Sequence, residues 1–297
     1  MISPSDWAEY QRLLAALEES REVDLPGRRP EVLCEQIIES QRRRRFTEAI
    51  KKRPLSEVLG DPNHPGFDPI RAAVLRSRKG DLDEAAWLAF LFTHFGKHSA
   101  EDYRLIATIY RGRGGGNRLT YREVHSDPQQ MQSWLDSQSA TFRGAMLKFG
   151  NHRKYETLKA GPRGPGDVLS SYIRWVEREG GHATLLLRPA SSLAHRFELI
   201  YNSMEVTRFG RTAKFDYLTM LGKLGISPIA PGKAYLRGAT GPRRGADLLF
   251  GLGKLTAEDA ERRLNQLNSR LYLTYDVLED ALCNWQKSPD RFISFRG

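Results

Sequence analysis

The hydrophobic residues of this chain recur at helical spacing through most of its length and alternate at strand spacing almost nowhere. The two clearest N-terminal patterns, at residues 6–18 and 31–52, have the three- and four-residue spacings that predict helices. Further helices are expected at 70–78, 83–94, 100–110, 128–137 and 191–203, with a long one opening at Thr256. There, Thr256 and Asp259 have the spacing of a capping box. The best strand candidate, TLLL at 184–187, suits a buried helix equally well, so the pattern predicts a mainly α fold.

Two segments rich in glycine and proline interrupt the helical pattern. They are GRGGGNR at 112–118 and GPRGPG at 161–166, and each is a candidate boundary between lobes. A length of 297 residues allows one large domain or two lobes. We expect a two-lobed helical fold with an N-terminal helical lobe at 1–140 and a core at 141–255. The long C-terminal helix, within 256–297, is expected to pack on the lobes.

Cysteine usage and hydropathy limit the class of protein. The two cysteines, Cys34 and Cys283, lie far apart and lack the spacing of zinc ligands, which favours a reducing compartment. No run of eighteen apolar residues occurs, and the N-terminus lacks the basic start and apolar stretch of a secretion signal. We expect a cytoplasmic protein with no membrane partner, no metal and no other cofactor.

The formal charge of +10 is concentrated in two segments. Residues 201–254 hold nine Lys and Arg against three acidic residues, and residues 141–164 hold six against one. Both segments interleave this charge with aromatic residues, which is typical of a folded groove for a phosphate backbone. A run of four arginines at 42–45 is offset by acids at 35, 39 and 48, so it is predicted to be a solvated helix face. The charge distribution therefore favours a nucleic-acid partner.

The strongest binding motif is RFGRTAK, which lies between two predicted helices. A tight turn at Phe209 and Gly210 would let backbone N–H groups approach a phosphate, while Arg211 and Lys214 supply charge at the start of the next helix. The alternative is an ordinary helical hairpin with a basic face. The basic segment around the motif favours DNA binding.

A second motif, GATGPRRGA, spans residues 238–246. Small residues at Thr240 and Gly241 permit close backbone approach, and the guanidinium groups of Arg243 and Arg244 suit a phosphate or a base edge. An ordinary loop with solvated arginines explains the same residues equally well.

Two further blocks combine histidines with a Phe-Gly step. One contains His94, Lys97 and His98; the other packs polar side chains of six kinds into NHRKYE, namely Asn151, His152, Arg153, Lys154, Tyr155 and Glu156. Such density beside an aromatic residue is typical of an active site. Buried, hydrogen-bonded structural histidines are the alternative. A metal site on the first block is a weaker hypothesis, because no carboxylate stands at helical spacing from its histidines.

These blocks, in this order, resemble the family of alpha-glutamyl/putrescinyl thymine pyrophosphorylases, clade 3. The resemblance rests on FDPIRAAV, DEAAWLAFLFTHFGKH, KFGNHRKYE, RFGRTAKFDYL, GATGPRRGA and EDALCNW, which together cover most of the chain. It implies a relationship to helix-hairpin-helix DNA glycosylases and to anti-phage enzymes that remove modified bases, such as glucosylated hydroxymethylcytosine. The expected partner is then phage DNA, with no obligate protein partner.

The sequence departs from the glycosylase pattern at one place. Such enzymes usually carry an aspartate about a helix length beyond the hairpin, but ISPIAP at 226–231 contains no carboxylate. Lys214 lies near the place of the lysine that some of them use as a nucleophile, but it is shifted. The role of the aspartate therefore cannot be carried over to this chain, and the shift disfavours Lys214 as a nucleophile.

A glycosylase nevertheless needs a carboxylate, because positive charge builds on the sugar as the N-glycosidic bond breaks. Asp216 is the first candidate, since it lies one helical turn beyond the hairpin, and Glu156 is the second. A salt bridge with Arg211 or Lys214 is the structural alternative for Asp216.

The remaining candidates divide between a base or sugar pocket and the DNA surface. We expect the pocket to contain His94, Lys97, His98, Asn151, His152 and Tyr155. We expect the DNA surface to contain Phe209, Gly210, Arg211, Lys214, Thr240, Gly241, Arg243, Arg244, Arg153 and Lys154.

Two alternatives to a monofunctional DNA glycosylase remain from the sequence. A base transferase or pyrophosphorylase, as the family name suggests, would require a second substrate. A DNA-binding module without activity would bind with strong salt dependence and produce no abasic sites.

Overall fold

The computed structural model describes residues 2–23, 25–113, 118–150, 153, 155–251 and 255–294. These residues form helices and no strand, apart from one isolated bridge between His98 and Asp102. The mainly α class predicted from the sequence is confirmed. The chain divides into two compact units, which we call unit 1 (1–49 with 231–296) and unit 2 (50–230).

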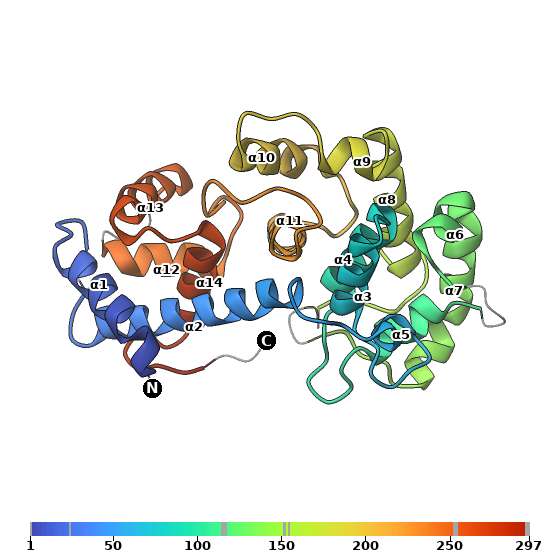
Figure 1. Cartoon of the computed structure of the whole chain (residues 1–297), viewed down its shortest axis with the longest axis horizontal. Coiled ribbons are helices and arrows are strands. Elements are labelled where there is room, and N and C mark those ends of the chain that lie inside the picture. The colour runs from blue at the N-terminus through green and yellow to red at the C-terminus, as the bar shows by residue number, and fades with distance from the viewer. Residues whose placement is uncertain are drawn as a thin grey trace. The chain divides into compact units, whose positions relative to one another are not determined.

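Unit 1 gathers helices from both ends of the chain around one apolar core (Figure 1). Its helices are α1 (Trp7–Glu18), α2 (Arg29–Ile50), α12 (Gly241–Phe250), α13 (Ala257–Leu271) and α14 (Tyr275–Trp285), with a short 3₁₀ turn at Pro4–Asp6. Small residues let two of these helices approach closely. A Cβ on Gly245 of α12 would lie 2.5 Å from the carbonyl oxygen of Leu282 in α14.

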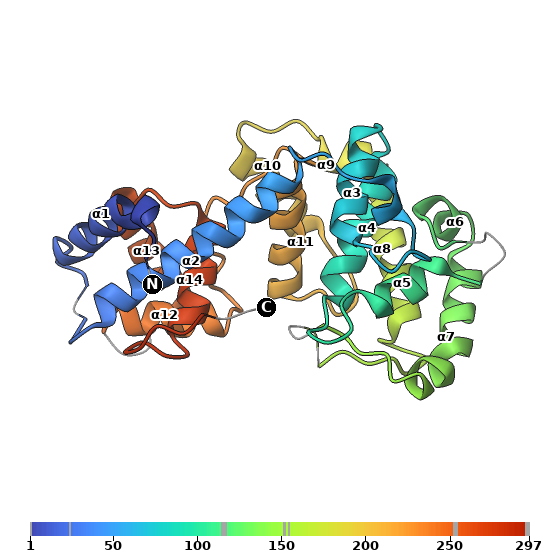
Figure 2. The ribbon, with the colours of Figure 1, turned by 60° about the horizontal axis from the view of Figure 1, so that its bottom comes forward.

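Unit 2 contains the middle of the chain. Its helices are α3 (Pro69–Arg78), α4 (Leu82–Phe95), α5 (Arg104–Arg111), α6 (Tyr121–Ser126), α7 (Pro128–Gly144), α8 (Pro165–Arg178), α9 (Gly181–Leu186), α10 (Leu193–Ser203) and α11 (Arg211–Leu224), with a 3₁₀ turn at Glu57–Gly60. Helix α4 is central, because it is apolar on nearly every side and contacts α3, α5, α6, α9 and α11. Helices α3 and α4 lie side by side in Figures 1 and 2.

Several helices begin where short polar side chains can bind the first free N–H groups. Asp68, followed by Pro69, accepts hydrogen bonds from two amides of α3. Asp127 and Ser192 cap α7 and α10 in the same way. The helices predicted at these three places are confirmed. They could be predicted because each start signal lies within a few residues of the helix that it begins.

One open alternative about the elements is decided by the structure, and two expectations differ from it. Residues 184–186 of TLLL belong to helix α9, with Leu187 as its C-cap residue, so the buried-helix alternative is the correct one. The predicted helix at 100–110 begins only at Arg104, because the ring nitrogen Nδ1 of His98 accepts from the amides of residues 100 and 101 and holds a turn there. The predicted long C-terminal helix is two helices, because Tyr272 adopts a left-handed φ of 52° that ends α13.

The division into units also differs from the three consecutive domains expected. The expected boundary after residue 140 falls inside α7, and the units instead meet in the sequence after residues 49 and 230. Unit 1 is built from two segments far apart in the chain, which no local composition signal indicates. Residues 114–117 of the predicted linker GRGGGNR lie outside the described residues.

Candidate functional site

The two Phe-Gly steps of the sequence pack against each other in unit 2. The amide of Gly150 donates to the carbonyl oxygen of Phe95 at 2.7 Å, and the rings of Phe95 and Phe149 stack at 5.5 Å. A Cβ on Gly150 would lie 2.6 Å from the backbone of Gly96, so only glycine permits this contact. Gly96 itself has φ 71°. We call this contact the Phe-Gly clasp; it joins the end of α4 to the segment at 149–156.

The clasp brings Arg153 into contact with the last turn of α4. The guanidinium of Arg153 is buried and donates to the carbonyl oxygen of Thr93 at 2.7 Å, the hydroxyl of Tyr155 at 2.9 Å and the carboxylate of Asp216 at 2.7 Å. Burial acts to lower the pKa of Arg153, but Asp216 and Tyr155 outweigh it and hold the pKa above its usual value. Arg153 therefore faces inward and does not belong to a DNA surface, which corrects its expected role. A buried guanidinium needs these acceptors to compensate for lost hydration.

Asp216 and Tyr155 are brought together by this one guanidinium. The Asp216 side chain is 44% exposed and Tyr155 is 61% exposed, while the Arg153 side chain that holds them is only 6% exposed. Asp216 pairs with Arg153 and not with Arg211 or Lys214, the partners weighed from the sequence. The buried Arg153 guanidinium therefore holds a carboxylate and a phenol in fixed positions, and both are exposed to solvent.

Glu156 occupies a different environment. Its side chain is buried and forms an ion pair with Arg208, whose guanidinium also donates to the carbonyl oxygen of Tyr155 at 3.1 Å. Arg208 has a left-handed φ of 63°. Glu156 therefore stabilises the segment around Tyr155, whereas Asp216 is the accessible carboxylate.

The hairpin motif lies between α10 and α11, as its position between two predicted helices required. The Phe209 ring is buried and stacks on Phe90 at 4.9 Å, so it anchors the turn and cannot form part of a surface. Gly210 caps α11 with φ −73°, which any residue can adopt, and a Cβ there would meet no atom within 4 Å. The turn itself therefore does not require glycine at this position, and close approach of a phosphate to Gly210 remains a prediction.

The two cations of the motif lie in the first turn of α11. The Arg211 guanidinium lies over the Phe215 ring at 4.6 Å. Lys214 lies over Tyr201 at 5.4 Å, and partial burial lowers the pKa of Lys214. The start of α11 therefore combines the helix dipole with positive charge.

The three predicted site residues of the first histidine block do not share one role. His94 is fully buried among the rings of Phe90, Phe95, Phe149 and Phe209. Its Nε2 has no hydrogen-bond partner among the described residues, and burial together with Arg153 and Arg208 lowers its pKa to about 3. It is a neutral member of the aromatic cluster.

The other two residues of that block stabilise the turn after α4. Lys97 pairs with Asp102 at 3.1 Å, and His98 accepts from backbone amides of the same turn. Asn151, His152 and Lys154 lie outside the described residues.

The second basic motif lies in unit 1, at the start of α12. Arg243 pairs with Asp247 at 3.1 Å and donates to the carbonyl oxygen of Leu255, whereas Arg244 is exposed. A Cβ on Gly241 would lie 2.6 Å from the sulfur of Cys283 in α14. Gly241 therefore serves helix packing, and Thr240 is the N-cap residue of α12. Of the two arginines of this motif, Arg244 is the one whose side chain remains exposed, as a DNA contact would require.

A protein-family model matches most of the chain. Residues 28–297 match the model of the family described as Alpha-glutamyl/putrescinyl thymine pyrophosphorylase clade 3. The chain belongs to this family. No curated protein and no solved structure matches the chain. We call Arg153, Tyr155 and Asp216 the Arg153 cluster. In this clade 3 protein, the matched residues include both the Arg153 cluster of unit 2 and the α12 motif of unit 1.

The sequence did not indicate a hydrogen-bonded network in unit 2 of this clade 3 protein, which leads from the exposed Asp83 to the buried His182, Tyr172 and Tyr217. Asp83 contacts Nδ1 of His182 at 2.9 Å, Nε2 of His182 contacts the Tyr172 hydroxyl at 2.7 Å, and that hydroxyl contacts Tyr217 at 2.8 Å. Tyr217 follows Asp216 directly on α11. The hydrogen bonds of Tyr217 therefore fix the rotation of the helix that carries the exposed Asp216 carboxylate. The members of the network come from α4, α8, α9 and α11, and no spacing in the sequence connects them.

Asp83 also lines a polar cavity of about 580 Å³ in unit 2, together with Arg76, Glu84, Tyr121 and His125. Burial raises the pKa of Glu84 to about 7. Its carboxyl group contacts the Tyr110 hydroxyl at 2.5 Å and the amide of Tyr121 at 2.7 Å, so both oxygens are engaged. This cavity is formed by residues other than those of the Arg153 cluster.

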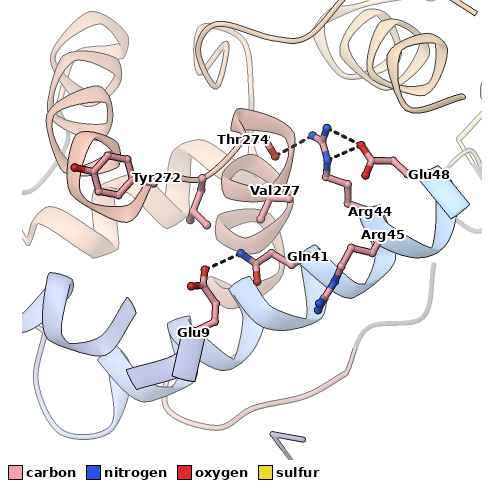
Figure 3. A pocket seen from close by; sticks show the side chains of 9 residues that line it. Glu9, Gln41, Arg44, Arg45, Glu48, Tyr272, Thr274 and Val277 are labelled. Atoms are coloured by element: carbon pink, nitrogen blue, oxygen red, sulfur yellow. Dashed lines mark hydrogen bonds and ion pairs between the residues drawn. The ribbon is translucent and has the colours of Figure 1, made fainter. Parts of the chain in front are cut away.

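Unit 1 has a smaller cavity of about 330 Å³, which we call the α2 cavity (Figure 3). Its lining includes Glu9, Gln41, Arg45, Tyr272 and Thr274. Within the described ranges, no group of three or more His, Cys, Asp or Glu residues could hold a metal ion. None of the described helices is both long and apolar enough to cross a membrane.

Proposed function

We propose that this protein is a DNA glycosylase that excises a hypermodified base, such as glucosylated hydroxymethylcytosine, from phage DNA. The observation that carries the proposal is the exposed Asp216 carboxylate, held at 2.7 Å by the buried Arg153 guanidinium beside the Tyr155 hydroxyl. A glycosylase needs such a fixed carboxylate, since the sugar gains positive charge in the transition state. The family membership supports a modified base as the target.

In this proposal the nucleotide is turned out of the duplex before the reaction. The bond between C1′ and the base nitrogen breaks, and its electron pair leaves with the base. Asp216 stabilises the positive charge at C1′ and accepts a proton as water adds there, which leaves an abasic site. Tyr155 is placed to contact the base or its sugar, and the first turn of α11 provides positive charge for the neighbouring phosphates.

The role of such an activity would be defence against phages whose DNA carries the modification. The test is to incubate the protein with glucosylated phage DNA and with unmodified DNA, and then to measure abasic sites and identify the released base by mass spectrometry. Release of the modified base from the first DNA alone is the expected result. Equal results on both DNAs would exclude the proposed substrate.

The role of Asp216 has its own test. Asp216→Asn keeps a partner for Arg153 but removes the charge, so excision should be lost while the fold and DNA binding remain. A matched control is Glu205→Gln, because Glu205 is an exposed carboxylate of the α10–α11 segment that pairs with Arg178 at 2.8 Å. Unchanged turnover in Asp216→Asn would assign the role to another group, with Glu156 the next candidate.

The family description supports a second candidate function, a base transferase or pyrophosphorylase of modified thymine. Such an enzyme would alter the base only when a second substrate is present. Base release from DNA by the protein alone, with no added amine or phosphate donor, would exclude it.

A further inference from the structure

The α2 cavity differs from the Arg153 cluster in both location and chemistry. It lies in unit 1, between α2 and residues 272–277, which comprise the segment joining α13 to α14 and the first turn of α14. Figure 3 shows Tyr272 at one end and Arg44 with Glu48 at the other, with Glu9 and Gln41 on one side. None of these residues belongs to the proposed catalytic site.

Each charged group of the cavity already has an opposite charge beside it. Arg44 pairs with Glu48 at 2.8 Å and also with Asp276. Arg45 pairs with Asp6 at 2.8 Å, and Glu9 pairs with Arg12 at 2.7 Å. Because the charges are balanced, the cavity offers little attraction to a phosphate or another polyanion. It therefore fits a neutral ligand better than a charged one.

The same side chains keep unused hydrogen-bonding capacity. Among the described residues, nothing donates to the carbonyl oxygen of Gln41 or to the second carboxylate oxygen of Glu48, and Nε and Nη1 of Arg45 have no acceptor. The Thr274 hydroxyl accepts from Arg44 at 2.9 Å, so its hydrogen remains available. The cavity thus offers donors and acceptors together, which is what a ligand with several hydroxyl groups requires.

The cavity also has apolar surface and an aromatic ring at its rim. Leu273 and Val277 contribute the apolar part. Tyr272 is 81% exposed and has φ 52°, a conformation that costs a residue with a Cβ about 1–2 kcal/mol. Glycine is the usual residue at such a helix end. An exposed ring kept at this cost is best explained by a contact made outside the chain.

We propose that the α2 cavity binds a pyranose sugar. The hydroxyl groups of the sugar contact Gln41, Arg45, Glu48 and Thr274, and its C–H face lies against Tyr272 and the apolar wall. A nucleotide would use the same ring and arginines, but the balanced charges argue against its phosphate. The sugar reaches the cavity either free or as a substituent of a modified base.

The first experiment measures free sugar binding by saturation-transfer NMR. Full-length protein is mixed with methyl α-glucopyranoside or methyl β-glucopyranoside, without DNA. We expect transfer to the sugar in the natural protein and loss of it in Tyr272→Gly and Gln41→Leu. Trp7→Ala is the control, because Trp7 is an exposed aromatic residue of the same unit that does not line the cavity. Tyr272→Gly should also unfold at a higher temperature, since the strain is removed, which separates lost binding from unfolding.

The second experiment measures DNA-borne sugar. Each protein carries Asp216→Asn, and duplexes with glucosylated and with plain hydroxymethylcytosine are compared. Adding Tyr272→Gly should weaken binding of the glucosylated duplex about tenfold and leave the plain duplex unchanged.

Loss caused by Tyr272→Gly in either experiment supports the inference. It is overturned when neither experiment shows a sugar effect that depends on Tyr272. It is also overturned when thymidine monophosphate, and not a glucoside, gives the Tyr272-dependent signal. Because neither experiment requires base release, a failure here is distinct from a failure of the proposed glycosylase activity.

Discussion

The buried guanidinium of Arg153 donates to the half-exposed carboxylate of Asp216 at 2.7 Å, and so connects the segment after the Phe-Gly clasp to helix α11. The same guanidinium donates to the Thr93 carbonyl oxygen, at the end of α4. One side chain thus fixes three parts of unit 2 around the proposed catalytic carboxylate.

The effects of Arg153 and Asp216 on stability should therefore differ. Arg153→Met leaves the Thr93 carbonyl oxygen without its donor and removes the anchor of Asp216, so we expect it to lower the free energy of unfolding by about 2–4 kcal/mol. Asp216→Asn keeps an acceptor at the surface and should cost less than about 1.5 kcal/mol. Urea denaturation measures both values. Equal losses in the two variants would show that the Thr93 contact contributes little.

The Phe-Gly clasp gives a second expectation. A Cβ on Gly150 would lie 2.6 Å from backbone atoms of Gly96 and Lys97, and backbone cannot move aside cheaply. Gly150→Ala should destabilise the protein by about 1–3 kcal/mol, as overpacking does, and reduce activity by displacing Arg153. Gly144→Ala at the end of α7 is the matched control, because its Cβ would meet nothing within 4 Å and should stabilise by up to about 1 kcal/mol. Thermal unfolding of both variants distinguishes steric conflict from a general effect of replacing glycine.

His94 should make the protein less stable in mild acid. Its pKa is about 3 in the folded state, because burial and the charges of Arg153 and Arg208 oppose protonation, and about 6.5 when unfolded. Between these values the unfolded chain binds a proton that the folded chain does not, so stability falls as pH decreases from 6.5 towards 3. The loss at pH 5 should be on the order of 2 kcal/mol.

The measurement for His94 is the difference between the natural protein and His94→Phe. Phenylalanine suits the surrounding aromatic rings and removes the unpaired Nε2. Glu84 has the opposite effect, because its pKa of about 7 is raised, so its contribution to stability is lost as pH rises from 4.5 to 7. Comparing the two proteins cancels the Glu84 contribution. Parallel curves of unfolding free energy against pH would mean that His94 binds its proton equally well in the folded and the unfolded state.

The arginine pair of α12 should separate into a structural and a binding residue. Arg243 pairs with Asp247 and donates to the Leu255 carbonyl oxygen, so Arg243→Ala should lower the melting temperature. Arg244 is exposed, so Arg244→Ala should leave the melting temperature unchanged and weaken DNA binding. For the Arg244→Ala variant, the slope of log DNA affinity against log salt concentration should be shallower by about 1, as expected for one lost phosphate contact. An unchanged slope would exclude Arg244 from the DNA surface.

The helices and the basic segments were determined by the sequence itself. Apolar spacing placed most helices, and local caps such as Asp68 with Pro69, or Ser192, marked where they begin. The order of the blocks also indicated the family, which the match over residues 28–297 confirms. These features are local, since each depends on residues within a few positions of one another.

The tertiary structure alone decided which side chains meet. Arg153 looked like a DNA-binding cation and proved to be a buried support for Asp216, 63 positions further along the chain. Gly241 looked like a site of close backbone approach to a phosphate and proved to pack against Cys283, and Gly150, which had no predicted role, packs against the backbone of Gly96. Such pairings depend on how distant segments fold together, and they leave no periodic pattern in the sequence. The residue types therefore suggested the chemistry, but only packing could show which of them remain exposed to perform it.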